Sequence, residues 1–276
     1  MSFSYNTLRL SLINKIKQIK WNCGINQYCT FSENASQIAQ YLHLSIKTGS
    51  LPGDSLAFYD GISKTIVIDL RKGNSERINF TFYHEVSHHL IQTDDVIYSQ
   101  MIDLVGENNN LDEIEEKLAN AGAAEFLMPS DEIKKIIDNK GFSINLFPEI
   151  YEKYPASRQS VLVQMAQCSS HQCILCLCSP TMDENLRNRL MVEFSTRSPS
   201  TKYLIGKNHL IPLDHFLNNV SKSNRFLTDR KAQVPYKKSG IIHKVSSEGL
   251  FYDGKVYALF NLTEVPSSKS DIPTLF

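Results

Sequence analysis

Apolar residues recur every three to four positions through most of the first 167 residues, which predicts a mainly helical N-terminal part. N-cap residues and prolines divide this pattern into segments; Ser32 is the expected cap of the second one. A polar connection is expected between residues 92 and 110. The predicted helices cover residues 7–19, 33–42, 75–88, 111–127, 131–139, 144–154 and 157–167.

Two pairs of short apolar runs, each interrupted by an Asp-Gly turn, predict β-hairpins. The first pair is residues 56–59 and 65–68, and the second is residues 250–252 and 255–260. Between these hairpins, the run 174–178 reads as a strand and 183–192 as a helix. The C-terminal part is therefore expected to be a small α/β domain.

The formal net charge is zero but is unevenly distributed. Residues 1–167 carry 15 Lys and Arg against 20 Asp and Glu, whereas residues 168–276 carry 14 against 9. The basic C-terminal part is the better candidate for an anionic partner. No apolar run suits a signal peptide or a membrane span, so we expect a cytoplasmic protein with reduced cysteines and no membrane partner.

The segment His84-Glu85-Val86-Ser87-His88 lies on the helix that follows the first hairpin. Its spacing puts two imidazoles one turn apart on the same helix face. Two neutral imidazoles make two corners of a tetrahedral Zn²⁺ site, and the intervening Glu85 can reach water at the metal. The alternative is a surface helix with two unrelated histidines.

The acidic helix over residues 111–127 supplies a third candidate ligand. Glu116 shares one face with small residues and Asn120, so this face can approach another helix and present an oxygen to a metal. Glu116 is therefore the expected ligand. The other carboxylates near the start read as an acidic first turn, which is common at helix N-termini: Asp112, Glu113 and Glu115.

Taken together, these segments resemble the ImmA/IrrE family of zinc metallopeptidases. That family pairs His-Glu-x-x-His with Glu-x-x-Ala-Asn and a Leu-Met-Pro ending, which match residues 84–88, 116–120 and 126–129. The resemblance covers about residues 30–165. One departure is the stretch 121–123, Ala-Gly-Ala, where the family commonly has an aromatic residue before small ones.

The resemblance implies a gluzincin-like site in which His84, His88 and Glu116 bind Zn²⁺ and Glu85 is the general base, with Asn120 supporting the ligands. It also implies a site-specific endopeptidase that cleaves a helix-turn-helix repressor of the Xre type and so induces a stress, DNA-damage or phage-defence response. The strand at residues 65–69 is the expected holder of the substrate, as an added strand.

The expected fold class is α+β, in four parts. A mostly helical, zincin-like metallopeptidase domain with a small β-sheet covers residues 1–129. A helix-turn-helix-like pair follows at 130–167, then an α/β domain that resembles a GAF-like sensor at 168–264, and a flexible tail at 265–276.

Two features of the C-terminal part leave alternatives open. Basic and aromatic residues interleave as in single-strand binders, which makes single-stranded DNA a candidate activator; a solvated basic loop is the alternative. Cys173 and Cys176 suit either a second zinc or redox site or a buried strand, and the buried strand is favoured. The basic candidates are Lys222, Arg225, Arg230, Lys231, Lys237 and Lys238.

The functional alternative to a peptidase is a non-catalytic DNA-binding or ligand-sensing regulator with a structural zinc site. Glu85 argues against it, because a structural site needs no base. A general digestive protease is disfavoured, since no secretion signal is apparent.

Overall fold

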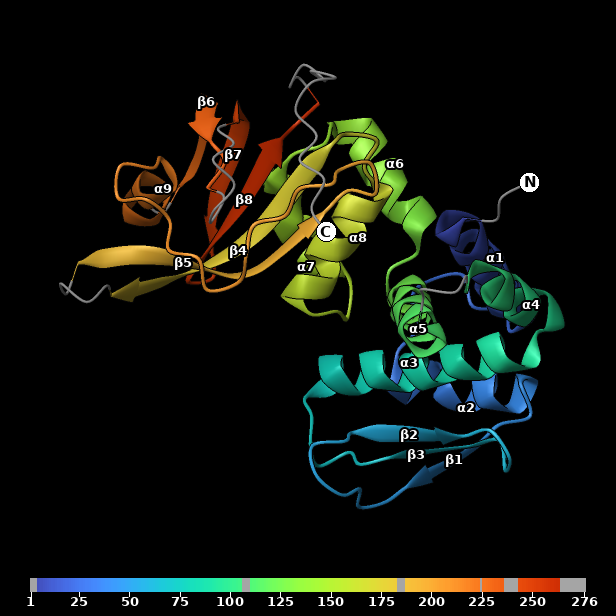
Figure 1. Cartoon of the computed structure of the whole chain (residues 1–276). Helices are drawn as coiled ribbons and strands as arrows, with labels where there is room; N and C mark the ends of the chain where they lie inside the picture. The colour runs from blue at the N-terminus through green and yellow to red at the C-terminus, as the bar shows by residue number, and fades with distance from the viewer. Residues whose placement is uncertain (1–3, 106–109, 183–186, 224, 236–242, 264–276) are drawn as a thin grey trace. The chain divides into compact units, whose positions relative to one another are not determined.

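The computed structural model describes residues 4–105, 110–182, 187–223, 225–235 and 243–263 (Figure 1). The chain divides into two compact units: residues 1–132 with 151–160, and residues 133–150 with 161–276. The segment expected as a separate helix pair contributes to both units. Within the described ranges, every helix is too short or too polar to span a bilayer.

The first unit contains five complete helices and a small sheet among the described residues. Each of these helices begins at a polar residue whose side chain accepts a backbone N–H of the first turn, which satisfies donors that the helix itself leaves open. The helices are α1 (Tyr5–Asn22), α2 (Phe31–Tyr41), α3 (Ser75–Thr93), α4 (Asp95–Leu104) and α5 (Leu111–Leu127).

Two details of this helical part differ from the sequence-based expectation. Thr30, rather than Ser32, caps α2. The polar connection expected between residues 92 and 110 is wrong, because Asp94 caps α4 there. The apolar face of α4 buries only Ile97 and Met101, one turn apart, so its helical signal is weak.

The small sheet has the order β1-β3-β2, with β1 (Ser45–Thr48), β2 (Ala57–Asp60) and β3 (Thr65–Ile68). The expected hairpin is confirmed as the antiparallel pair β2–β3, and β1 adds in parallel on the other side of β3. Because β3 is central, it cannot hold an added strand, which corrects the expectation for residues 65–69. Strand β2 instead has the free edge.

The register of β2 decides which backbone groups face that edge. Asp69 N–H donates to the Leu56 carbonyl, so Leu56 belongs to the set that bonds to β3. Bonded and non-bonded positions alternate along an antiparallel pair, which puts Phe58 in the bonded set too. Ala57 and Tyr59 therefore point their N–H and C=O groups toward the free edge.

Helix α3 lies between the sheet and α5 (Figure 1). The α3–α5 approach is close because Gly122 faces Ser87: a Cβ atom on Gly122 would lie only 2.3 Å from Ser87 Oγ. Next to this point, the buried rings of Tyr83 and Phe126 stack with centroids 4.8 Å apart. Gly122 thus fixes how near α5 comes to α3.

The second unit is built on an antiparallel sheet of order β5-β4-β8-β7-β6. The hairpin expected at residues 250–260 is confirmed as β7–β8. The helix expected at 183–192 is wrong from residue 188 onward, where strand β5 buries Leu190 and Val192 in alternation; residues 183–186 lie outside the described ranges. The strands are β4 (Cys173–Met182), β5 (Asn188–Arg197), β6 (Phe226–Gln233), β7 (Lys244–Tyr252) and β8 (Lys255–Asn261).

Helix α9 (Leu217–Ser223) packs on β7 at Gly249, and parts of a helical segment before β4, residues 133–150 and 161–168, complete the unit. That segment comprises α6 (Ser130–Lys140), the 3-10 turn η1 (Ile144–Leu146), α7 (Phe147–Lys153) and α8 (Arg158–Cys168). In it, Phe147 stacks on Tyr257 of β8 with centroids 3.9 Å apart. The mixed architecture agrees with the α+β class; the GAF-like sensor and the helix-turn-helix remain predictions.

Candidate metal centre

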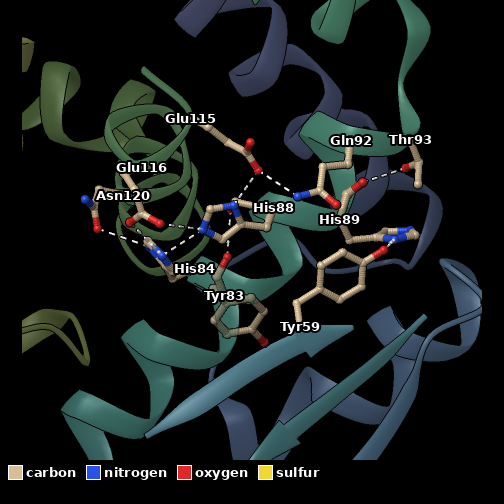
Figure 2. A network of polar contacts seen from close by, with 11 residues as sticks. Tyr59, Tyr83, His84, His88, His89, Gln92, Thr93, Glu115, Glu116 and Asn120 are labelled. Atoms are coloured by element: carbon tan, nitrogen blue, oxygen red, sulfur yellow. Dashed lines mark hydrogen bonds and ion pairs between the residues drawn. The ribbon is translucent and has the colours of Figure 1, made fainter. Parts of the chain in front are cut away.

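Three side chains from α3 and α5 converge at one point (Figure 2). His84 and His88 lie one turn apart on α3, with their Nε2 atoms 3.0 Å from each other. Glu116 on α5 brings its Oε2 to 3.4 Å from Nε2 of His84 and its Oε1 to 3.4 Å from Nε2 of His88. Among the described residues, this is the one group of three or more His, Cys, Asp or Glu side chains whose ligand atoms meet in this way.

The second nitrogen of each imidazole is held by an acceptor. Asn120 Oδ1 lies 3.1 Å from Nδ1 of His84, and Glu115 Oε1 lies 2.7 Å from Nδ1 of His88. Each Nδ1 therefore donates its proton outward, which leaves the Nε2 lone pair free. The outward bonds select the tautomer that a metal ligand needs.

The donor set fits Zn²⁺. Two Nε2 lone pairs and a carboxylate face one another, and a cation between them removes their mutual repulsion. Zinc–nitrogen bonds of about 2.0–2.1 Å place tetrahedrally arranged ligand atoms about 3.3 Å apart, close to the separations seen here. Burial lowers the pKa of His84, and the adjacent His88 lowers it further, which favours the neutral ligand form.

The charge state of His88 is set by opposing influences. Burial lowers the pKa of His88, but its hydrogen bond to Glu115 and the nearby carboxylates outweigh this and raise the pKa overall. The same bond lowers the pKa of Glu115, so Glu115 stays ionised. A proton and a metal ion therefore compete for His88, and Glu115 strengthens the binding of either.

Glu85 does not belong to the converging group but lies beside it. It lines a cleft of about 360 Å³ together with the two histidines, Glu116 and the residues Ala57 to Tyr59 of β2. Burial raises the pKa of Glu85, Glu116 raises it further, and His88 and a hydrogen bond from the Tyr59 backbone oppose the rise. The cleft thus holds a half-buried carboxylate between the candidate metal ligands and the free edge of β2.

The aromatic and imidazole residues that flank the His-Glu-x-x-His turn, Tyr83 and His89, point away from it (Figure 2). Tyr83 donates its hydroxyl to the Thr30 carbonyl at 3.0 Å. His89 faces Tyr59, whose hydroxyl lies 2.7 Å from its Nδ1. Neither residue supplies a metal ligand.

Glu115, expected to belong to the acidic first turn of its helix, instead takes part in the site. Glu115 is half-buried and also accepts a hydrogen bond from Gln92 Nε2 at 2.8 Å. The helical spacing indicated this role: Glu115 lies on the same face of α5 as the buried residues Ala119 and Gly122, and this face is called the seam below. The expected face through Glu116 lies next to that seam and is more exposed.

The basic candidates lie in the second unit. Lys222 is in the last turn of α9, Arg225 precedes β6, and Arg230 and Lys231 lie on β6, which is an edge strand. All four are exposed. Lys237 and Lys238 lie outside the described residues, so a basic surface that includes them remains a prediction.

The cysteines of β4 are buried in the sheet. Cys173, Cys176 and Cys178 are at most 1% exposed, and Cys176 and Cys178 belong to the apolar core of the second unit. Burial raises the pKa of Cys173 to about 11 and that of Cys178 to about 12. Protonated, inaccessible thiols behave as small apolar side chains, in agreement with the favoured interpretation.

Comparison with known proteins finds a peptidase-family match in the N-terminal part of the chain. Residues 39–165 match the Peptidase_M78 model, described as the IrrE N-terminal-like domain. The radiation response metalloprotease IrrE of Deinococcus deserti is 30% identical over 145 residues, which are 51% of this chain and 51% of that protein. The IrrE of Deinococcus radiodurans is 26% identical over 152 residues, covering 51% and 46%.

The chain thus spans about half the length of the curated relatives that it matches. A solved structure described as a Mycobacterium tuberculosis transcriptional regulator aligns with a TM-score of 0.57 at 13% identity, over 91% of this chain and 76% of that chain. At that identity the likeness concerns the fold alone. Residues 39–165 are thus similar to the IrrE N-terminal-like domain, and the two IrrE relatives support the resemblance of this part of the chain to the ImmA/IrrE family of metallopeptidases.

Proposed function

We propose that the first unit is a zinc-dependent, site-specific endopeptidase that cleaves a transcriptional repressor of the Xre type. One observation carries the proposal: Glu85, which is not one of the three converging residues, lines the same cleft as His84 and His88. A carboxylate in this place has a use in hydrolysis and none in a structural metal site.

Each residue of the site has a distinct task in this proposal. His84, His88 and Glu116 hold Zn²⁺, which when bound supplies a Lewis acid that polarises the scissile carbonyl. Glu85 takes a proton from the attacking water and passes it to the leaving amine as the C–N bond breaks. Because burial raises the pKa of Glu85, its basicity is nearer to the value that both proton transfers require.

The substrate binds as an extended segment along β2. Ala57 offers its N–H and C=O groups at the free edge and Tyr59 offers its C=O, since the Tyr59 N–H bonds to Glu85; this edge borders the cleft that contains Glu85. Main-chain hydrogen bonds to such an edge give affinity without sequence preference. Phe58, which is 55% exposed and lines the cleft, offers an apolar contact for a substrate side chain.

The partner and the signal are inferred from the family. Two relatives are described as radiation response metalloproteases, which supports a role for this chain in a stress, DNA-damage or phage-defence response in the cytoplasm. The second unit then acts as a GAF-like sensor. Single-stranded DNA is the candidate activator, and the exposed basic residues beside and on β6 are its candidate contacts.

The alternative is a non-catalytic DNA-binding or ligand-sensing regulator with a structural zinc site. It predicts that the chain cleaves no protein. It also predicts that the chain binds DNA in a salt-dependent way and that Arg230→Ala weakens this binding. The test is metal analysis of the full chain, followed by incubation with the Xre-type repressor encoded beside its gene, with and without single-stranded DNA. Cleavage that requires zinc and is lost in Glu85→Gln supports the peptidase; an intact repressor in every condition supports the alternative.

A further inference from the structure

Two neighbouring stripes of α3 have different partners. His84 and His88 form one stripe, which faces Glu116. Glu85 and His89, also four residues apart, form the next stripe, and this one faces β2. Residues four apart on a helix lie one above the other, so a single strand residue can contact both members of the second stripe.

Tyr59 is that strand residue, and its side chain contacts His89. The Tyr59 hydroxyl lies 2.7 Å from His89 Nδ1, and the two rings meet edge to face with centroids 5.5 Å apart. The two residues are only 8% and 4% exposed. A hydrogen bond between two buried side chains is costly to break, because the polar group that is left without its partner cannot bond to water instead.

The backbone of Tyr59 makes the second contact. The β2–β3 register points its N–H toward the free edge, and the Glu85 carboxylate accepts a hydrogen bond there. One residue of β2 is thus tied to α3 at two points, one turn apart. A shift of Tyr59 away from His89 would also move the N–H that holds Glu85.

We propose that Tyr59 and His89 are positioning residues, which set the orientation of Glu85 and the distance of the substrate-binding edge from α3. The proposal rests on the base role of Glu85 given above. It explains why a tyrosine and a histidine are buried beside the cleft although neither is a metal ligand. The competing explanation is that the pair only stabilises the fold.

The first test measures the geometry without activity. In the full, zinc-loaded chain, residue-resolved amide exchange compares the wild type with Glu85→Ala, Tyr59→Phe and His89→Leu. We expect the amide of residue 59 to exchange about tenfold faster or more in each variant. The amide of Phe58 bonds to β3 and serves as the internal control, with little change expected. An unchanged amide at residue 59, or an equal rise at Phe58, would overturn the proposal.

The second test measures the consequence for cleavage. Tyr59→Phe should lower kcat about 10- to 100-fold with KM and zinc content nearly unchanged, since a displaced base slows chemistry more than binding. Tyr98→Phe, a hydroxyl deletion at an exposed site on α4, is the matched control. His89→Asn, which keeps a polar group near the Nδ1 position, should retain more activity than His89→Leu.

Equal kcat values for Tyr59→Phe and Tyr98→Phe would reduce the pair to a stabilising role. If the wild type cleaves no repressor, the proposed function fails, but the exchange comparison still decides whether Tyr59 and His89 position Glu85. The two failures are therefore distinguishable.

Discussion

Glu115 Oε1 lies 2.7 Å from Nδ1 of His88, and this bond joins α5 to α3 independently of the candidate ligand Glu116. A carboxylate that accepts from a ligating imidazole fixes the tautomer and raises the basicity of the ligand. The adjacent residues Glu115 and Glu116 thus serve one centre in two ways: one would bind the metal, and the other orients a ligand.

Glu115→Gln should weaken zinc binding about 10- to 100-fold, because an amide holds the His88 proton less strongly than a carboxylate. Competition with a chromophoric chelator measures the dissociation constant. Glu113→Gln is the matched control, since Glu113 is exposed on the same helix and pairs with Lys117. Equal affinities of the two variants would show that the Glu115–His88 bond does not matter for the metal.

Removal of the metal should destabilise the first unit. Three acceptor groups converge in the site, so zinc binds the folded state and adds about 2.7 kcal/mol when free zinc is 100 times Kd. Thermal unfolding with and without a chelator measures this difference. His84→Ala should unfold at the same temperature in both conditions; a zinc-dependent shift that persists in this variant would place the metal elsewhere.

Gly122→Ala should destabilise the chain by about 1–3 kcal/mol, because the added Cβ would overlap Ser87 and push α5 away from α3. Urea unfolding measures the loss. Gly206→Ala provides the comparison, since a Cβ at Gly206 meets no atom within 4 Å. A loss no greater than that of Gly206→Ala would mean that the two helices can separate at little cost.

Asp69 links acid stability to the loop before β2. Hydrogen bonds from the Arg71 side chain hold the pKa of Asp69 well below its usual range, and the Leu51 N–H adds to this. A lowered pKa stabilises the folded state fully above the unfolded pKa of about 3.9, and this stability declines below that pH and is lost as the pH falls through the lowered pKa of the folded state. Asp69→Asn should therefore reduce stability more at pH 7 than at pH 2; a pH-independent loss in denaturant unfolding would contradict this assignment.

Local sequence signals predicted much of the first unit. The predicted start at residue 75 agrees with α3, and the predicted limits of the helix over 111–127 agree with α5. The central strand position of β3 could not be predicted, because β1 is a four-residue strand whose parallel pairing depends on contacts distant in sequence.

In the candidate site, too, some residues could be predicted from the sequence and others could not. The spacing of His84 and His88 follows from helix geometry, and Glu116 was found through the resemblance and its helix face. The roles of Glu115 and Tyr59 depend on which seam of α5 packs on α3 and on the register of β2. Such contacts are set by tertiary packing, so the helical pattern that puts Glu115 on the buried seam does not by itself identify its partner, and the strand pattern does not identify the contacts of Tyr59.

The most direct measurement of the central claim is zinc content and repressor cleavage by Glu85→Gln beside the wild type. Glutamine keeps the size of the side chain and can still accept from the Tyr59 N–H, but it cannot take a proton from water. We predict one zinc ion per chain in both proteins and cleavage by the wild type alone. Undiminished cleavage by zinc-loaded Glu85→Gln would contradict the account.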